Sequence, residues 1–378
     1  MFITKKEAKR YTFEPYEKCP CESGKKYKFC CFEKSKSFPK NEKEKHHPKR
    51  IKAEANKIFN GTDFKTCFGF DTKECKGGII GAHSLQNNGV LDKIATDNHV
   101  YKLSVEMTEQ SPILEFEKKG KKQASRFNGF CKYHDEVYFS NIEDIVYTGT
   151  DEQNFWYAFR AFSFEYHRKK RLGNHFPKLF AKFPYATRLP YIQMNYRTCQ
   201  LDLRDKAREY ERFKQTYLSG SYSELESFTK VLPYRVGFTG TTAVAVKWDI
   251  SGNEALDIFD YKKETFISAL YISVIPREYT TLIIVSRFKE DECYKQVIEK
   301  LHSNSDVDLL FSYLTFCLAE YSENVYFSPE VIDNLPKDAK KNILSAFQSS
   351  IIPDYELRLE SYIRGFQVNL FHYRLSVE

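Results

Sequence analysis

Four cysteines within thirteen residues constrain this chain more than any other feature of its sequence. Residues 19–31 read CPCESGKKYKFCC. The thiols follow the pattern C-x-C-x8-C-C and belong to Cys19, Cys21, Cys30 and Cys31. The rest of the segment is charged or turn-forming and offers too little apolar surface to offset the entropy lost on folding. One tetrahedral Zn²⁺ held by four thiolates would supply the missing stabilisation, on the order of 10 kcal/mol or more.

The segment resembles the SEC-C motif, a short zinc module at the C-terminus of the protein-export motor SecA and in other bacterial proteins. All four cysteines fit that pattern, and so do Ser23, Gly24, Lys26, Tyr27 and Lys28. The resemblance implies one bound zinc ion and a role in docking onto a protein or a ribosome. Glu22 stands where the motif usually has glycine, the residue that turns at the least steric cost.

The positive charge of the chain is concentrated at its N-terminal end. The first 60 of the 378 residues contain 17 Lys and Arg against 8 Asp and Glu, whereas the remainder contains 41 against 43. A basic arm favours nucleic acid, a ribosome or an acidic protein surface as its partner, and it is equally typical of a solvated tail. Two further basic runs, at 121–126 and 167–171, could contact phosphates or form solvated helix faces.

The sequence predicts a cytoplasmic protein without a membrane partner. Its opening residues, MFITKKE, lack the apolar segment of a signal peptide. No run of 18 apolar residues predicts a transmembrane helix. In a reducing compartment, closely spaced pairs among the 10 cysteines indicate metal ligands rather than disulfides.

A second group of metal-binding residue types lies further along the chain. Cys131 and His134 are separated by two residues, so a tight turn would let both face one metal ion. Cys67 and Cys75 would supply the other pair, although seven residues between them exceed the usual spacing of a zinc knuckle. The set predicts a second structural zinc site. The alternative is a buried cluster of cysteines and histidine without metal.

Residues 78–83 predict a strand that ends in His83, and the following loop contains Asn87 and Asn88. This order resembles the zinc-stapled HNH endonucleases, which have a treble-clef or ββα-metal fold. The resemblance implies that His83 is the general base of phosphodiester hydrolysis, with Asn88 and His99 in the catalytic set. It also implies that Mg²⁺ or Mn²⁺ stabilises the charge that develops on the phosphate.

The sequence departs from that family at position 82, where alanine replaces the usual metal-binding aspartate. Three alternatives are open: another side chain holds the catalytic metal, the fold is a non-catalytic binding module, or His83 is a structural zinc ligand. The acids available to the first alternative are Asp71, Asp92, Asp97 and Asp135. The resemblance itself implies His99, His134 or Asp135 as candidate ligands of the catalytic metal.

Residues 151–378 carry patterns of helices and strands but no catalytic signature. The chain lacks a P-loop, a dinucleotide-binding fingerprint and a nucleophile elbow, which argues against the corresponding enzyme classes. Helices are predicted from 155 to about 171, over 200–230, and at 291–302, 305–322, 336–349 and 354–365. Strands are predicted within 234–250 around a turn at Gly240, and at 271–276 and 280–288.

Together these patterns predict an α+β protein of several domains. They are a zinc module (1–35), a basic linker (36–50), an HNH-like zinc-stapled domain (51–150) and a larger antiparallel sheet flanked by helices (151–378). One compatible function is a zinc protein that binds or cleaves nucleic acid, by analogy in bacterial antiphage defence. The other is a non-enzymatic zinc adaptor that docks proteins or ribosomes through its N-terminal module.

Overall fold

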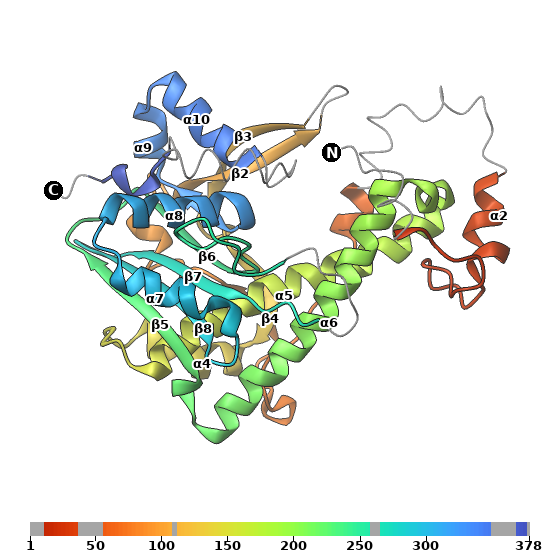
Figure 1. Ribbon diagram of the computed structural model, residues 1–378, viewed down its shortest axis with the longest axis horizontal. Coiled ribbons are helices and arrows are strands. Elements are labelled where there is room, and N and C mark those ends of the chain that lie inside the picture. Colours follow the sequence, from red (N-terminus) through yellow and green to blue (C-terminus); the bar gives the residue numbers. More distant parts are fainter. Residues whose placement is uncertain (1–10, 37–55, 108–111, 258–264, 349–367, 376–378) are drawn as a thin grey trace. The chain divides into compact units, whose positions relative to one another are not determined.

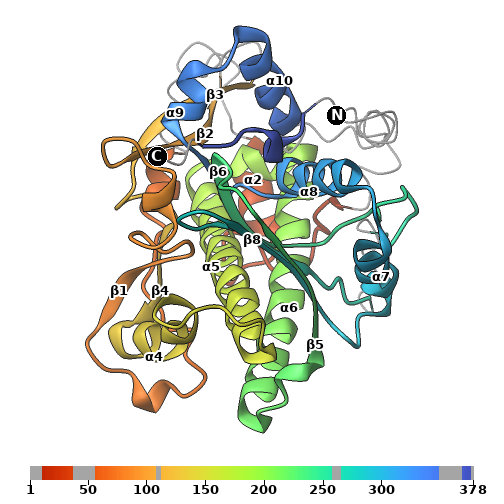
Figure 2. The ribbon, with the colours of Figure 1, turned by 90° about the vertical axis from the view of Figure 1, so that its left-hand side faces the viewer.

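The computed structural model describes residues 11–36, 56–107, 112–257, 265–348 and 368–375 (Figures 1 and 2). These residues form two compact units, each assembled from segments that are distant in the sequence. Among the described residues, unit 1 draws on 11–36, 56–65, 107 and 166–208, and unit 2 on 66–106, 112–165, 209–257, 265–348 and 368–375. The domain boundaries predicted from the sequence stay predictions. Most of the predicted linker and the helix predicted at 354–365 lie outside the described residues.

Two long helices, α5 (Asp151–Lys182) and α6 (Pro190–Ser219), contribute residues to both units and run side by side (Figures 1 and 2). In unit 2, three phenylalanines of α5 recur at helical spacing and are fully buried: Phe155, Phe159 and Phe162. Phe213 of α6 lies within 5.0–5.5 Å of all three rings. Helix α5 was predicted to end near residue 171 and instead continues to Lys182. In unit 1 its apolar face goes on through Phe176 and Phe180, which pack on Tyr196.

Unit 1 combines these helix segments with the cysteine-rich segment. The segment contains the 3₁₀-helix η1 (Tyr27–Phe29) and the short helix α2 (Cys31–Lys36). A further 3₁₀-helix, η5 (Pro184–Arg188), connects α5 to α6. The core is aromatic: Phe13 and Tyr27 are almost fully buried, and Phe13 lies edge-on to Phe180 at 5.8 Å.

Unit 2 is organised around a seven-stranded sheet with the order β3-β2-β9-β6-β7-β8-β5. The strands are β2 (His99–Met107), β3 (Pro112–Gly120), β5 (Leu225–Leu232), β6 (Phe238–Val244), β7 (Leu270–Pro276), β8 (Thr281–Phe288) and β9 (Val325–Phe327). The pairings of β2, β5, β6, β7, β8 and β9 that are described are antiparallel, as the sequence predicted for this sheet.

Helices cover both faces of the central strands. Leu270, Ile272 and Val274 of β7 join one buried apolar cluster with α7 (Lys295–Ser303) and α8 (Val307–Tyr321). The intervening Tyr271 points to the opposite face, because successive side chains of a strand alternate. There its ring lies 5.2 Å from that of Phe213. The α+β class predicted from the sequence is confirmed.

Two further local predictions required correction. The turn predicted at Gly240 lies inside β6, where this glycine pairs with Val274 and the strand is buried throughout. The helices predicted over 200–230 end at Ser219, and 225–232 form the edge strand β5. The sheet also takes β2 and β3 from before residue 151. The unpredicted strand β9 makes this connection by pairing Phe327 with Tyr101 and with Phe238.

Two short C-terminal helices, α9 (Pro329–Asn334) and α10 (Lys337–Gln348), follow β9. Phe347 of α10 packs at 5.9 Å against Phe327. None of the described helices is long and apolar enough to cross a membrane.

We predict that Phe213→Ala lowers the free energy of unfolding of unit 2 by about 3–5 kcal/mol, because it leaves a cavity among rings that cannot collapse onto it. Leu218→Ala is the matched control on the same helix, since Leu218 is 62% exposed. Urea denaturation followed by circular dichroism measures both. Equal losses in the two variants would contradict this packing.

Candidate metal centres

The four thiols of the N-terminal segment converge on one point. Their sulfur atoms lie within 4.8 Å of one another, and this group could hold a metal ion. Cys21 Sγ is 3.4 Å from Cys19 Sγ and 3.6 Å from Cys30 Sγ. A tetrahedral zinc with Zn–S bonds of about 2.3 Å sets sulfurs about 3.8 Å apart. The arrangement therefore fits a four-thiolate site with little adjustment.

The backbone around this group forms a turn that is held by hydrogen bonds between its two sides. The Cys19 amide donates to the Lys25 carbonyl at 2.8 Å, and the Tyr27 amide donates to the Glu17 carbonyl at 2.9 Å. Gly24 has a φ of +77°, and Glu22, in the position where the SEC-C motif usually has glycine, has a φ of +57°. A glutamate in this left-handed region is strained because of its Cβ atom. The departure noted in the sequence therefore leaves the turn intact at a conformational cost.

Thiol acidity in this group is uneven. Burial raises the pKa of Cys31 well above its ordinary value, and hydrogen bonds with Cys19 and Cys21 raise it further. Burial also raises the pKa of Cys21, but hydrogen bonds with Ser23 and Cys19 outweigh it and bring that pKa to about 7. Four buried thiolates would repel one another without a cation between them, so binding of a metal ion and deprotonation are coupled.

The second predicted group is also assembled. Cys67, Cys75, Cys131 and His134 place their ligand atoms within 4.8 Å of one another and could hold a metal ion. His134 Nδ1 lies 3.2 Å from Cys131 Sγ, 3.4 Å from Cys67 Sγ and 3.7 Å from Cys75 Sγ. A tetrahedral zinc with Zn–S of about 2.3 Å and Zn–N of about 2.0 Å sets these pairs about 3.5 Å apart. The donors thus fit one zinc, and their role as its ligands stays a prediction.

A small two-stranded unit holds these donors. Strands β1 (Ile79–His83) and β4 (Arg126–Cys131) pair antiparallel, with Ile79 opposite Cys131, and α4 (Lys132–Glu143) follows at once. Cys131 caps α4, and His134 lies in the first turn of that helix. Figure 2 shows β1, β4 and α4 grouped together. Cys131 and His134 thus lie at the start of α4, while Cys67 and Cys75 come from the chain that precedes β1.

Close contacts seat the imidazole of His134 among the sulfurs. A Cβ atom at Gly69 would lie 2.5 Å from the His134 ring, so only glycine fits there. The amides of Gly69 and Cys131 both donate to Cys67 Sγ at 3.4 Å. Burial raises the pKa of Cys67 to about 12, whereas hydrogen bonds with His134 overcome burial and lower the pKa of Cys131 to about 6.

His83 ends strand β1, as the sequence predicted. Its Nδ1 lies 3.0 Å from the Ala124 carbonyl, which can only accept, so Nδ1 carries the proton and Nε2 the lone pair. Burial lowers the pKa of His83 below its ordinary value of 6.5, and this outweighs the Ala124 hydrogen bond, which raises it. The charges of Arg160 and Arg126 lower the pKa further. The imidazole is therefore neutral at pH 7 and able to accept a proton at Nε2.

A buried arginine that sequence reasoning missed lies near this histidine. Arg160 of α5 is only 5% exposed, pairs with Glu143 and stacks on the Phe139 ring at 4.3 Å. Its Nε atom has no hydrogen-bond partner among the described residues. Arg160 and Ser84, the residue after His83, line a small pocket whose volume is about 10 Å³. That is room for about one water molecule.

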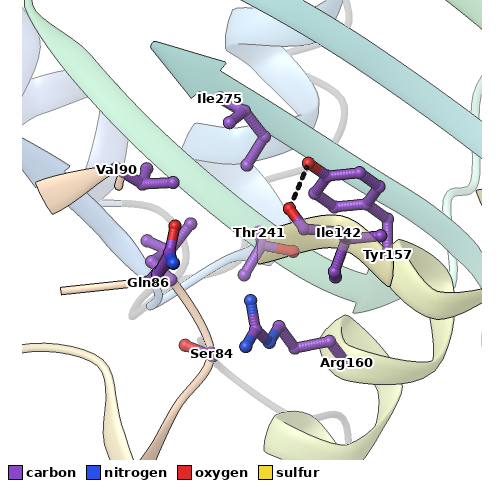
Figure 3. Close-up of a pocket in the computed structure, with 9 residues that line it drawn as sticks. Ser84, Gln86, Val90, Ile142, Tyr157, Arg160, Thr241 and Ile275 are labelled. Carbon is purple, nitrogen blue, oxygen red and sulfur yellow. Dashed lines mark hydrogen bonds between the residues drawn. The ribbon is translucent and has the colours of Figure 1, made fainter. Parts of the chain in front are cut away.

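Figure 3 shows that this pocket is polar on one side, where Arg160, Ser84, Gln86 and Thr241 meet. Val90 and Ile275 close it with apolar side chains, and the hydroxyl of Tyr157 donates to the Ile142 carbonyl at 3.4 Å. The one available sequence signal was a lone charge in the apolar run FWYAFRAF at 155–162. A charge in the middle of an apolar helix face requires a buried partner.

The other predicted catalytic residues do not join His83. Among the described residues, no hydrogen bond links His83, Asn88 and His99 to one another. Asn88 accepts from the side chain of Asn87 at 3.0 Å, and His99 Nδ1 donates to the Asp97 carbonyl at 2.6 Å. Their catalytic roles stay predictions.

The side chains proposed to replace the missing aspartate also have other surroundings. Asp71 caps the 3₁₀-helix η3 (Thr72–Glu74), and Asp92 pairs with Lys121. Asp135 is half-buried, and desolvation raises its pKa to about 6. In the described part of the chain, His83 belongs to no group of three side chains that could hold a metal ion.

Three cations of the two basic runs, which could contact phosphates or form solvated helix faces, are engaged within their own units. Lys121 is buried and pairs with Asp92 in unit 2. In unit 1, Lys169 pairs with Asp202, and the guanidinium of Arg171 lies 4.2 Å above the Phe59 ring. These contacts account for the three cations by packing within each unit.

Comparisons of this chain with protein-family models, with curated proteins and with solved structures found no match.

Elemental analysis of purified protein is predicted to find two zinc ions per chain. Cys30→Ser combined with Cys31→Ser removes two ligands of the first site, so that variant should retain one zinc. Cys131→Ser should also retain one, from the first site. Cys317→Ser is the control, since Cys317 is buried in α8 outside both groups. A wild-type content of one zinc would exclude one of the two sites.

Replacing Glu22 by glycine should relieve the strain of its positive φ. The expected gain in the stability of the zinc-bound turn is about 1 kcal/mol, since glycine reaches this backbone region without a Cβ clash. Competition with a zinc chelator measures this gain in stability: one of the two zinc ions should be released more slowly from Glu22→Gly than from wild type. Release that is unchanged or faster in Glu22→Gly would show that the turn is not strained at this position.

Proposed function

We propose that this chain is a two-zinc protein that cleaves phosphodiester bonds in nucleic acid, with His83 as the general base. The observation that supports it is the neutral imidazole at the end of β1, held in one tautomer by the Ala124 carbonyl. By the resemblance to HNH enzymes stated from the sequence, His83 at the end of β1 would be the base, and α4 follows the paired strand β4. In the same proposal, the N-terminal four-cysteine turn is a SEC-C-like module.

Both zinc ions would be structural in this account. Each site offers four protein donors, which leaves no open coordination position for a substrate or a water molecule. Zinc at Cys67, Cys75, Cys131 and His134 would hold α4 against the hairpin and thereby fix the place of His83. Removing it should abolish activity indirectly, by releasing the strand that carries the base.

The proposed chemistry at His83 is a proton transfer. Nε2 takes a proton from the attacking hydroxyl or water while the new P–O bond forms and the leaving oxygen departs. Arg160 is 5% exposed and paired with Glu143. Its charge adds to the effect of burial in lowering the pKa of His83, and no contact with the substrate is assigned to it. The described donors around His83 do not form a Mg²⁺ or Mn²⁺ site, so no step is assigned to such an ion.

A second candidate function is a non-enzymatic zinc adaptor, and one observation favours it. Ala82, which replaces the aspartate of HNH enzymes, is 2% exposed and opposes Phe127 in the β1–β4 pair. The strand is therefore closed by packing at the position where the family places a metal ligand. In that case the hairpin and helix would serve binding alone.

The deciding experiment incubates purified protein with plasmid DNA and with RNA, without added metal and with Mg²⁺ or Mn²⁺. We expect cleavage by wild type and a loss of at least 100-fold in His83→Ala, the scale of a missing general base. His302→Ala is the control, an exposed histidine on α7. Cleavage by His83→Ala at the wild-type rate would refute the role of His83. Wild type inactive under all conditions would favour the adaptor.

The pH dependence follows from the direction of the His83 pKa. The base must be neutral, and burial lowers its pKa below 6.5. Activity should therefore persist as pH falls through 6.5 and decline only at more acidic pH. An acidic limb with its midpoint above 6.5 would show that His83 is not the titrating base.

A further inference from the structure

We propose that four residues of unit 1, Tyr16, Lys26, Lys28 and Phe29, form a binding surface for single-stranded nucleic acid. We call them the Tyr16 surface. The inference rests on the proposed function, because it assigns the class of strand on which the protein would act. It is argued from unit 1 alone.

The two rings of the Tyr16 surface are exposed although they are large and apolar. Tyr16 is 59% and Phe29 61% exposed, in a unit where Phe13 and Tyr27 are almost fully buried. Their centroids are 6.3 Å apart and their planes are inclined by 60°. Both rings are therefore accessible to solvent, and an unpaired base could stack on them.

Two ammonium groups accompany these rings. Lys26 Nζ lies 5.4 Å and Lys28 Nζ 5.3 Å from the centroid of the Tyr16 ring. Lys28 Nζ is also 5.8 Å from the Phe29 centroid and donates to the Tyr16 hydroxyl at 3.3 Å. The cations are thus held within a few ångströms of the faces on which bases would stack, where a backbone phosphate can reach them.

These cations are available to a ligand. In the described part of the chain, neither Lys26 nor Lys28 forms an ion pair with a carboxylate. The neighbouring Glu17 is bound by the guanidinium of Arg197, at 2.7 and 2.8 Å from its two oxygens. No described carboxylate therefore pairs with either ammonium group, and an anion is the ligand that complements them.

The backbone beneath the surface is pre-organised. The Lys28 amide donates to the Pro15 carbonyl at 2.8 Å, which ties the two strands of the turn that carry Tyr16 and Phe29. Tyr27, between the two lysines, is buried and its hydroxyl lies 3.1 Å from Thr187 Oγ1. Cys30 adjoins Phe29, so a zinc ion in the first site would stiffen the same turn. A rigid platform loses less entropy when a ligand binds.

The size of the surface favours a nucleic-acid strand over a folded protein. A stable protein interface buries about 800 Å² on each partner, far more than two rings and two lysines present. Stacking on aromatic rings beside cations requires only one or two unpaired nucleotides. Double-stranded nucleic acid keeps its bases stacked internally and cannot use the rings. The lysines could instead serve only to offset the charge of a zinc–thiolate site, and the experiment separates the two roles.

The test measures binding of fluorescein-labelled (dT)12 and (U)12 to the full chain by fluorescence anisotropy, in the His83→Ala background so that no probe is cut. Tyr16→Ala with Phe29→Ala should weaken binding at least tenfold, since each stacked base contributes about fivefold or more. The control is Tyr191→Ala, another tyrosine of unit 1, which is 55% exposed. It should bind as the background protein does. Comparing the two probes tells whether the strand is DNA or RNA.

Lys26→Ala with Lys28→Ala should reduce the magnitude of the slope of log K against log salt by about 1.4, as expected for two lost phosphate contacts. Zinc content must stay at the background value. Loss of zinc in this variant would show that the lysines serve the metal site and would overturn their assignment.

The inference also fails if neither probe binds, if a labelled duplex binds as tightly as the single strands, or if the ring variants bind normally. Binding without cleavage by wild type would refute the proposed function and leave this surface standing. Cleavage at the same rate with and without the substitutions in the Tyr16 surface would support the proposed function and refute this surface.

Discussion

Thiolates gathered in a small volume repel one another, and burial opposes their ionisation. That constraint governs both cysteine groups of this protein. Burial raises the pKa of Cys67 to about 12 and that of Cys31 far above its ordinary value, whereas hydrogen bonds bring the pKa of the neighbouring Cys21 to about 7. A divalent cation resolves the conflict by replacing protons with metal–sulfur bonds. The local folds around the two groups depend on that replacement.

Each site joins chain segments that are also held by aromatic packing. In the N-terminal segment, Phe13 and Tyr27 are buried together with three of the four cysteines against α5, while the remaining residues are mostly charged and tied by backbone hydrogen bonds. In unit 2, the loop that carries Cys67 and Cys75 meets the hairpin and α4 at the imidazole of His134, with Gly69 pressed against its ring. By contrast, the seven-stranded sheet is stabilised by apolar packing on both faces and needs no metal.

Features that depend on residues close in the sequence could be predicted, and features that depend on residues distant in the sequence could not. Both donor groups were predictable because cysteine spacing carries the metal preference locally, as in Cys131 and His134 at the start of a helix. The hairpin of β7 and β8 was predictable for the same reason. The joining of β2 to β9 was not, because strand pairing across more than 200 residues leaves no local pattern. Gly240 was misread since a glycine inside a buried strand resembles one in a turn.

In the candidate site, too, local features could be predicted from the sequence and long-range contacts could not. A histidine at a strand end is a local signal and was found. Its setting depends on the 42 residues between β1 and β4, which include Ala124, and on α5, which supplies Arg160. Neither contact can be inferred from a single sequence, because each requires the packing of unit 2. Position 82 separates the enzymatic proposal from the binding proposal. The alanine there, visible in the sequence, stands where HNH enzymes have an aspartate that binds metal.

Zinc K-edge X-ray absorption tests the central claim most directly. For the wild type the account predicts an average shell of seven sulfurs at about 2.3 Å to one nitrogen at about 2.0 Å over two ions, from the four thiolates of one site and the three thiolates and imidazole of the other. With Cys30 and Cys31 replaced by serine, the remaining zinc should show three sulfurs and one nitrogen. A shell of sulfur alone, or one containing water oxygens, in that variant would contradict it.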